Sequence, residues 1–83
     1  MKVHVYKATK MGWAREAEGV WFDASRYTKE EAEAQFLPVE KFCEKNGRDF
    51  PYTCYKYDGQ TYHDYVYLGI FDYDNMPNAS TWP

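Results

Sequence analysis

Two side chains in the second half of the chain could form a nucleophilic pair. Cys54 and His63 lie on either side of an Asp58-Gly59 turn signal, and a two-residue hairpin there would place them opposite each other. Directly opposed side chains have Cβ atoms about 5 Å apart, which allows an imidazole to take the proton of a thiol. Asp64 is expected on the other face of its strand, however, and no glycine-rich turn offers an oxyanion site. The pattern favours an ordinary cross-strand pair, and the chain is predicted not to be an enzyme.

A metal site would have to use the few cysteines and histidines of the chain. These residues are His4, Cys43, Cys54 and His63. Their spacing matches no zinc signature, and the sequence contains no Cys-x-x-Cys. The acidic segment 72–75 resembles a calcium loop only in its first residues, because the required glycine and glutamate are absent. The sequence therefore predicts neither a metal nor a cofactor.

Aromatic residues carry the strongest functional signal. They make up 20% of the 83 residues, and nine of them are tyrosines. Tyr and Trp provide a large contact area at low entropic cost, and they are enriched at recognition surfaces. A chain this short has a small interior, so many of these rings are expected at the surface. This composition predicts a small binding domain.

The first half of the chain predicts two strands and a capped helix. Residues 2–8 and 19–23 alternate in polarity and are expected to be antiparallel neighbours. Thr28-Lys29-Glu30-Glu31 is a capping box, in which side chains and backbone N–H groups bond reciprocally. An apolar stripe at helical spacing follows, formed by Ala32, Phe36, Val39 and Cys43. Asn46-Gly47 is interpreted as the helix stop, and Pro38 either kinks one helix or separates two short ones.

The second half predicts a hairpin from residues 51–57 and 60–72, closed by Asp58-Gly59. One face is expected to pack on the helix, and it carries Tyr55, Tyr57, Tyr62, Val66, Leu68 and Ile70. The opposite face is expected to be open, and it carries Tyr52, Cys54, Lys56, His63, Tyr65, Tyr67 and Phe71. Gly69 is a candidate for a bulge or bend.

These elements predict an α+β fold. The sheet would have four antiparallel strands in the chain order β-β-α-β-β, with one kinked or split helix packed on one face. Residues 1–74 would form a single domain and residues 75–83 an irregular C-terminal tail. Trp82 would either pack back on the domain or act as an anchor.

The predicted function is a small non-enzymatic module that binds a protein partner, or a second copy, through its open aromatic face. The predicted contact residues are Trp21, Tyr52, Tyr65, Tyr67 and Phe71. A single-stranded nucleic-acid binder that uses the same rings is the alternative, although a net charge of −3 disfavours it. In a third reading the rings only stabilise the sheet, by about 0.2–1 kcal/mol per cross-strand pair.

Other features of the sequence favour a cytoplasmic protein. No apolar run reaches the length of a membrane span, so no membrane partner is expected. The first residues lack the apolar region of a secretory signal. The two cysteines are too few for a disulfide scaffold and are expected to be reduced.

The segment Gly19-Val20-Trp21-Phe22-Asp23-Ala24 resembles the opening segment of ArdA-type antirestriction proteins, which likewise precedes an acidic helix. Members of that family are longer and far more acidic, and the chain is not identified as one of them. The resemblance implies one form of the binding function, namely a phage or mobile-element accessory protein that inhibits a host factor.

Overall fold

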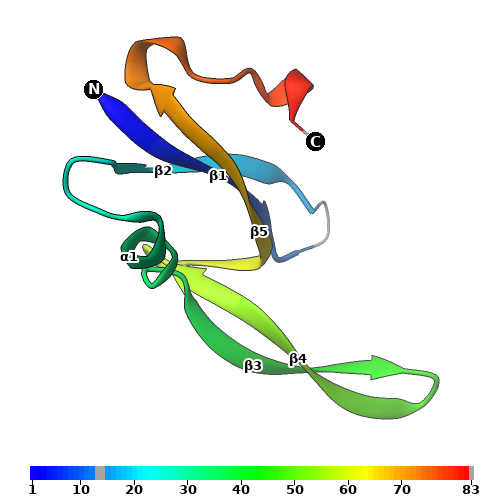
Figure 1. The fold of residues 1–83 in the computed structure, drawn as a ribbon. Coiled ribbons are helices and arrows are strands. Elements are labelled where there is room, and N and C mark those ends of the chain that lie inside the picture. The colour runs from blue at the N-terminus through cyan, green and yellow to red at the C-terminus, as the bar shows by residue number, and fades with distance from the viewer. Residues whose placement is uncertain (13–14, 83) are drawn as a thin grey trace.

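The fold is mostly sheet. The computed structural model describes residues 1–12 and 15–82. Within these residues, five strands form one antiparallel sheet in the order β2-β1-β5-β4-β3 (Figure 1). The strands are β1 (Lys2–Lys10), β2 (Ala17–Asp23), β3 (Leu37–Lys45), β4 (Arg48–Tyr57) and β5 (Gln60–Asp72). One short helix, α1 (Lys29–Glu33), precedes β3, and two 3₁₀ turns, η1 (Tyr73–Asn75) and η2 (Ala79–Thr81), follow β5.

The start of the helix was predicted correctly, but its length was not. The Glu31 backbone N–H donates to Thr28 Oγ1 over 3.1 Å, and the Thr28 N–H donates to Glu31 Oε1 over 3.0 Å. This reciprocal pair is the predicted capping box. The helix nevertheless ends at Glu33, and of the predicted stripe only Ala32 and Phe36 are buried. The four-stranded sheet with a packed helix is therefore wrong, because residues 37–45 form a fifth strand.

Local chemistry explains why these residues are extended. A proline inside a helix costs about 3 kcal/mol, whereas an edge strand accepts it because the missing N–H can face away from the ladder. Pro38 lies in β3, which is an edge strand of the sheet. Asn46 and Gly47 have φ values of 55° and 76°, as a type I′ hairpin turn requires. The Asn-Gly pair that was interpreted as a helix stop therefore joins β3 to β4.

The second hairpin forms as predicted next to its turn. Asp58 and Gly59 have φ values of 50° and 77°, and the predicted pairs Tyr57↔Gln60 and Tyr55↔Tyr62 are present. The hydrogen-bonded ladder between β4 and β5 stops there, because the two strands then follow different neighbours.

A β-bulge beyond this ladder reverses the side-chain alternation of β5. On β1, the adjacent residues Thr9 and Lys10 pair with Asp64 and Tyr62, which leaves His63 as the extra residue. One extra residue moves every later side chain to the opposite face of the sheet. The later tyrosines of β5 consequently share a face with Tyr62, contrary to the prediction.

A second shift lies between Tyr67 and Gly69. Val5 pairs with Gly69 and Tyr6 with Tyr67, so Leu68 is the extra residue. Gly69 has a φ of 122°, a conformation that residues with a Cβ rarely adopt. The predicted irregularity at Gly69 is confirmed, and it aligns the end of β5 with the start of β1.

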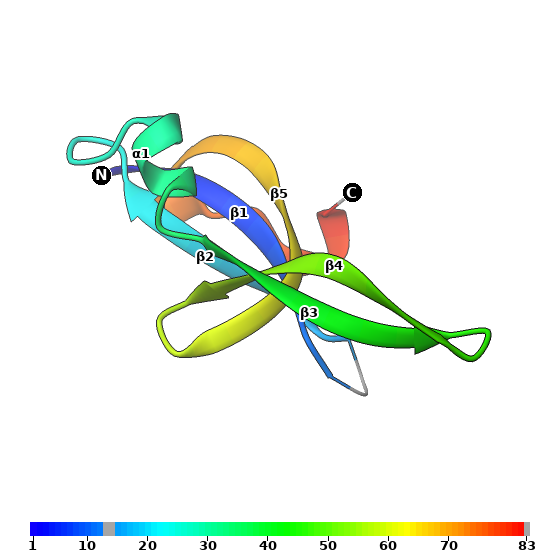
Figure 2. The same cartoon turned by 90° about the horizontal axis from the view of Figure 1, so that it is seen from below.

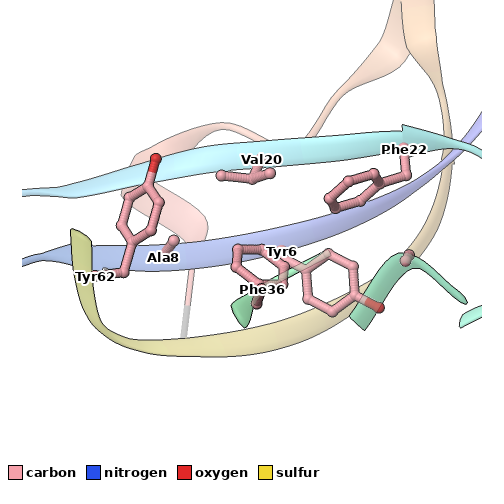
Figure 3. Packing of buried hydrophobic residues seen from close by; sticks show 7 residues of the cluster. Tyr6, Ala8, Val20, Phe22, Phe36 and Tyr62 are labelled. Carbon is pink, nitrogen blue, oxygen red and sulfur yellow. The ribbon is translucent and has the colours of Figure 1, made fainter. Parts of the chain in front are cut away.

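The hydrophobic core is an aromatic cluster between α1 and one face of the sheet (Figure 3). Its buried residues are Tyr6, Ala8, Val20, Phe22, Ala32, Phe36 and Tyr62. Five half-buried tyrosines pack against it: Tyr27, Tyr55, Tyr57, Tyr65 and Tyr67. The Phe36 ring is stacked on Tyr65 with centroids 4.4 Å apart and planes 10° apart. Such pairs contribute about 0.5–1.5 kcal/mol beyond the burial of their area.

The opposite face of the sheet is met by the C-terminal tail. Val3 and Val5, which alternate with Tyr6, are fully buried on that face. The Tyr73 backbone N–H donates to the Met1 carbonyl over 2.8 Å. The Trp82 ring lies against Gly19, where a Cβ would meet it at 3.4 Å. The predicted open aromatic face is therefore wrong, since the tyrosine side faces the helix and the tail returns to the other side.

Candidate binding surface

The most exposed part of the molecule is the distal half of the β3–β4 hairpin. We call residues 40–51 the arm, because every one of them is exposed and the hairpin extends away from the remaining strands (Figures 1 and 2). The molecule measures 48 × 27 × 19 Å with a radius of gyration of 14.4 Å. A compact chain of this length would have a radius of gyration of about 12 Å. The larger observed value reflects the arm, which projects beyond the rest of the sheet.

The register of the arm separates its charges. Lys41 is opposite Tyr52, Cys43 is opposite Phe50, and Lys45 is opposite Arg48. Opposed residues share a face and successive residues alternate. One face, here called the basic face, therefore carries Lys41, Cys43, Lys45, Arg48, Phe50 and Tyr52. The other, the acidic face, carries Glu40, Phe42, Glu44, Asp49, Pro51 and Thr53.

This separation is complete within the arm. The basic face has three cationic side chains and no carboxylate, and the acidic face has three carboxylates and no cation. The arm is neutral as a whole, so neither composition nor net charge reveals the pattern. Among the described residues, Lys41, Lys45 and Arg48 form no ion pair.

A groove of about 400 Å³ lies where the basic face meets the body of the protein. Its lining residues are Lys10, Met11, Gly12, Arg15, Cys43, Phe50, Tyr52 and His63. The Tyr52 ring lies 5.8 Å from the His63 ring at an interplanar angle of 31°, and its hydroxyl donates to Met11 Sδ over 3.5 Å. The groove therefore combines aromatic rings with basic side chains and contains no acidic residue in its lining.

Of the predicted contact residues, Tyr52 lies in this groove and Trp21 lies elsewhere on the surface. Trp21 is 42% exposed on β2, and its ring is 4.9 Å from that of Tyr73. Phe71 is half-buried and lines a concavity of about 330 Å³ under the tail, together with Trp82. Trp21 and Phe71 are opposite Val5 and Val3 of β1, on the sheet face that the tail meets. Tyr52 lies apart from them in the groove beside the arm, so the three rings do not form one surface.

The other two predicted contacts, Tyr65 and Tyr67, are half-buried and pack against the core. Tyr65 is stacked on Phe36, and burial raises the pKa of its hydroxyl. The Tyr67 hydroxyl is 3.1 Å from His4 Nδ1, while His4 Nε2 donates to the Tyr27 carbonyl over 2.8 Å. The Lys29 ammonium group lies 5.1 Å from the Tyr67 ring centroid. Both tyrosines thus have internal partners that account for their positions.

Two exposed rings were missed by the sequence analysis. Phe42 is 70% exposed and Phe50 is 38% exposed. The signal that could have found them is Asn46-Gly47 flanked by Lys45 and Arg48, which predicts a hairpin with both phenylalanines on its strands. The interpretation of residues 28–45 as helical concealed it.

The predicted opposition of Cys54 and His63 is wrong. The two residues lie beyond the β4–β5 ladder, and the buried Cys54 thiol donates to the Val39 carbonyl over 3.5 Å. His63 Nδ1 is instead 3.9 Å from Asp64 Oδ2, because the bulge changes the direction of both side chains. Within the described residues, no group of three or more His, Cys, Asp and Glu side chains is placed to hold a metal ion.

Another concavity, of about 730 Å³, runs along β2. In it, the Tyr62 hydroxyl donates a hydrogen bond to Glu18, which also pairs with Lys10 over 3.2 Å. The bond from Tyr62 lowers the pKa of Glu18, and burial raises the pKa of the Tyr62 hydroxyl. Both changes oppose acid–base catalysis at neutral pH, since the carboxylate becomes a weaker base and the phenol a weaker acid.

Neither a search for membrane-spanning helices nor a comparison with known proteins identifies a function. In the parts of the chain that the structure describes, no helix combines the length and the apolar character that crossing a bilayer requires. Comparison with protein-family models, curated proteins and solved structures finds no match.

Proposed function

We propose that the chain is a small, non-enzymatic binding module that docks on a protein partner through the arm. The observation that supports this function best is the exposure of all residues from 40 to 51, with Phe42 at the middle of the acidic face. A free two-stranded hairpin is marginally stable in water, so an arm of this kind is expected to gain order from a partner. Complete burial of one phenylalanine contributes about 1.5–3 kcal/mol to binding.

The edges of the arm favour binding to a different protein over edge-to-edge strand pairing between copies of this chain. Pro38 lies at the base of β3 and Pro51 on β4, and each lacks the N–H that a further strand would pair with. Both strands carry adjacent charged residues, and charged side chains are one way in which natural proteins protect edge strands from pairing with one another. An accessory or inhibitor protein of a phage or mobile element is one biological form of such a module.

A site-specific crosslinking experiment tests this function. A photoreactive phenylalanine analogue placed at Phe42 is expected to capture a partner from a host extract, whereas the same group at the exposed Ser25, outside the arm, is not. The captured protein is then purified and its affinity is measured. Phe42→Ser is expected to weaken binding at least about 10-fold, which corresponds to 1.4 kcal/mol, and Val66→Ser, an exposed apolar control on β5, less than about 2-fold.

Equal crosslinking at both positions, or equal loss of affinity in both variants, would reject the arm as the docking surface. Sedimentation of the pure protein adds a second check. A dimer that Phe42→Ser dissociates would show that the partner is another copy of the chain.

A further inference from the structure

The cations of the basic face are available to an anionic ligand. Lys41, Lys45 and Arg48 are exposed, share one face and have no carboxylate between them. The carboxylates of the arm lie on the other side of the hairpin, so the local field on the basic face is positive although the protein carries a net charge of −3. Salt screens charges that lie farther from a ligand than the Debye length, which is about 8–10 Å at 0.1–0.15 M ionic strength. The attraction of a ligand close to the surface therefore depends on the charges near it and less on the net charge of the protein.

The rings of the same face are spaced along one strand. Phe50 and Tyr52 are two residues apart on β4, which corresponds to about 6.8 Å along a strand. This is twice the rise of 3.4 Å per nucleotide along the axis of a duplex, so each ring matches one nucleotide of a single strand whose rise per nucleotide is about doubled. His63 adds a third ring, 5.8 Å from Tyr52.

We propose that the basic face of the arm, with the groove at its base, binds single-stranded nucleic acid. Lys41, Lys45 and Arg48 contact phosphates, and bases stack on Phe50 and Tyr52. Aromatic side chains within a basic groove are the common arrangement of proteins that bind single strands without sequence preference. This inference goes beyond protein docking, because it uses the face of the arm opposite to Phe42.

An acidic peptide is the competing ligand. Its carboxylates would satisfy the three cations, but Asp and Glu side chains have no aromatic face that would stack on two rings at strand spacing. Nucleobases all present a π face and stack on such rings regardless of sequence. The combination of rings and cations on one face therefore favours nucleic acid over an acidic peptide.

Fluorescence anisotropy with labelled oligo-dT and oligo-U of about 12 nucleotides tests the proposal at two salt concentrations. Three phosphate contacts predict a slope of log K against log salt of about −2.1, so affinity falls about 18-fold between 50 and 200 mM salt. The double variant Lys45→Gln/Arg48→Gln retains one contact, and its affinity falls only about 3-fold over the same range. The control variant Lys2→Gln/Arg26→Gln has the same net charge as Lys45→Gln/Arg48→Gln, but its substitutions lie outside the arm. It is expected to keep the slope of the wild-type protein.

A second pair of variants tests the rings. Phe50→Leu retains an apolar residue that fits a strand, and it is expected to weaken binding about 5- to 150-fold, the range that one stacked base supplies. Tyr73→Leu removes an exposed ring outside the arm and is expected to leave affinity unchanged. Circular dichroism spectra of all variants verify that the fold is retained.

Three results would overturn the proposal. The first is no anisotropy change at about 100 µM protein in 50 mM salt, the weak end of non-specific affinities. The second is a combination of two findings: polyglutamate binds as tightly as the oligonucleotides, and Phe50→Leu leaves the affinity unchanged. This combination would assign the face to acidic peptides. The third is an equal effect of Phe50→Leu and Tyr73→Leu. None of these results depends on Phe42, so they are independent of the protein-docking test.

Discussion

Replacement of Tyr65 by alanine tests which face of β5 is internal. The Tyr65 ring is stacked on Phe36 at 4.4 Å and makes edge contacts with Tyr6 at 5.8 Å and Tyr55 at 4.8 Å. Each of these three aromatic pairs contributes about 0.5–1.5 kcal/mol, and solvent compensates part of the loss because the position is half-buried. Tyr65→Ala is therefore expected to lower the free energy of unfolding by about 3 kcal/mol. The adjacent residue Val66 is 46% exposed, so Val66→Ala is expected to cost less than about 1 kcal/mol.

Chemical denaturation followed by circular dichroism, together with thermal melting, measures both values. A domain of 83 residues has a total stability of about 4–12 kcal/mol. A loss of 3 kcal/mol therefore lowers Tm by about 12–24 °C. If Tyr65→Ala does not fold, Tyr65→Leu keeps part of the buried area and is expected to lose about half as much. A larger loss in Val66→Ala than in the Tyr65 variant would refute the bulge at His63 and restore the aliphatic residues of β5 to the core.

Three further predictions follow from local contacts. Gly47→Ala places a Cβ at a φ of 76° and is expected to cost about 1–2 kcal/mol; amide hydrogen exchange should show faster exchange throughout the arm, with protection in β1 unchanged. Thr28→Ala removes the capping box, so the free energy of unfolding is expected to fall by about 1 kcal/mol in urea denaturation. The pKa of Glu18 is lowered from 4.5 by the hydrogen bond from Tyr62, so this carboxylate stabilises the fold above pH 4.5 and the stabilisation is lost as pH falls through its folded pKa. In Tyr62→Phe the pKa of Glu18, measured by NMR titration, is expected to rise, and the stability difference between pH 7 and pH 3 to shrink; an unchanged pKa would contradict the hydrogen bond.

Local signals in the sequence identified the features that depend on neighbouring residues. The capping box at Thr28 and Glu31 needs only four consecutive residues, and the turn at Asp58-Gly59 needs only a positive φ at two. Both are present as predicted. The same logic applied to Asn46-Gly47 would have found the arm, but the stripe that began at Ala32 indicated a helix, and the turn was assigned to its end.

The candidate surface was predicted only in part. The aromatic composition predicted rings at the surface, but most of them form the core cluster or pack against it. Tyr52 lies in the groove beside the arm. Tyr65 and Tyr67 are half-buried and pack against the core cluster instead. The separation of basic from acidic residues on the arm could not be read while residues 37–45 were interpreted as helical, because helical and strand periodicities place the same residues on different faces.

The sequence by itself determined the helix start, the hairpin turn at Asp58-Gly59 and the abundance of rings, since each depends on residue types within a few positions. Tertiary structure alone decided which rings are internal. The extra residue at His63 exists only because β1 pairs with β5, more than 50 positions away in the chain, and it moves Tyr65 and Tyr67 from one face of the sheet to the other. Pairing between distant strands has no signature in local periodicity, so the division between core and surface became defined only when the sheet was complete.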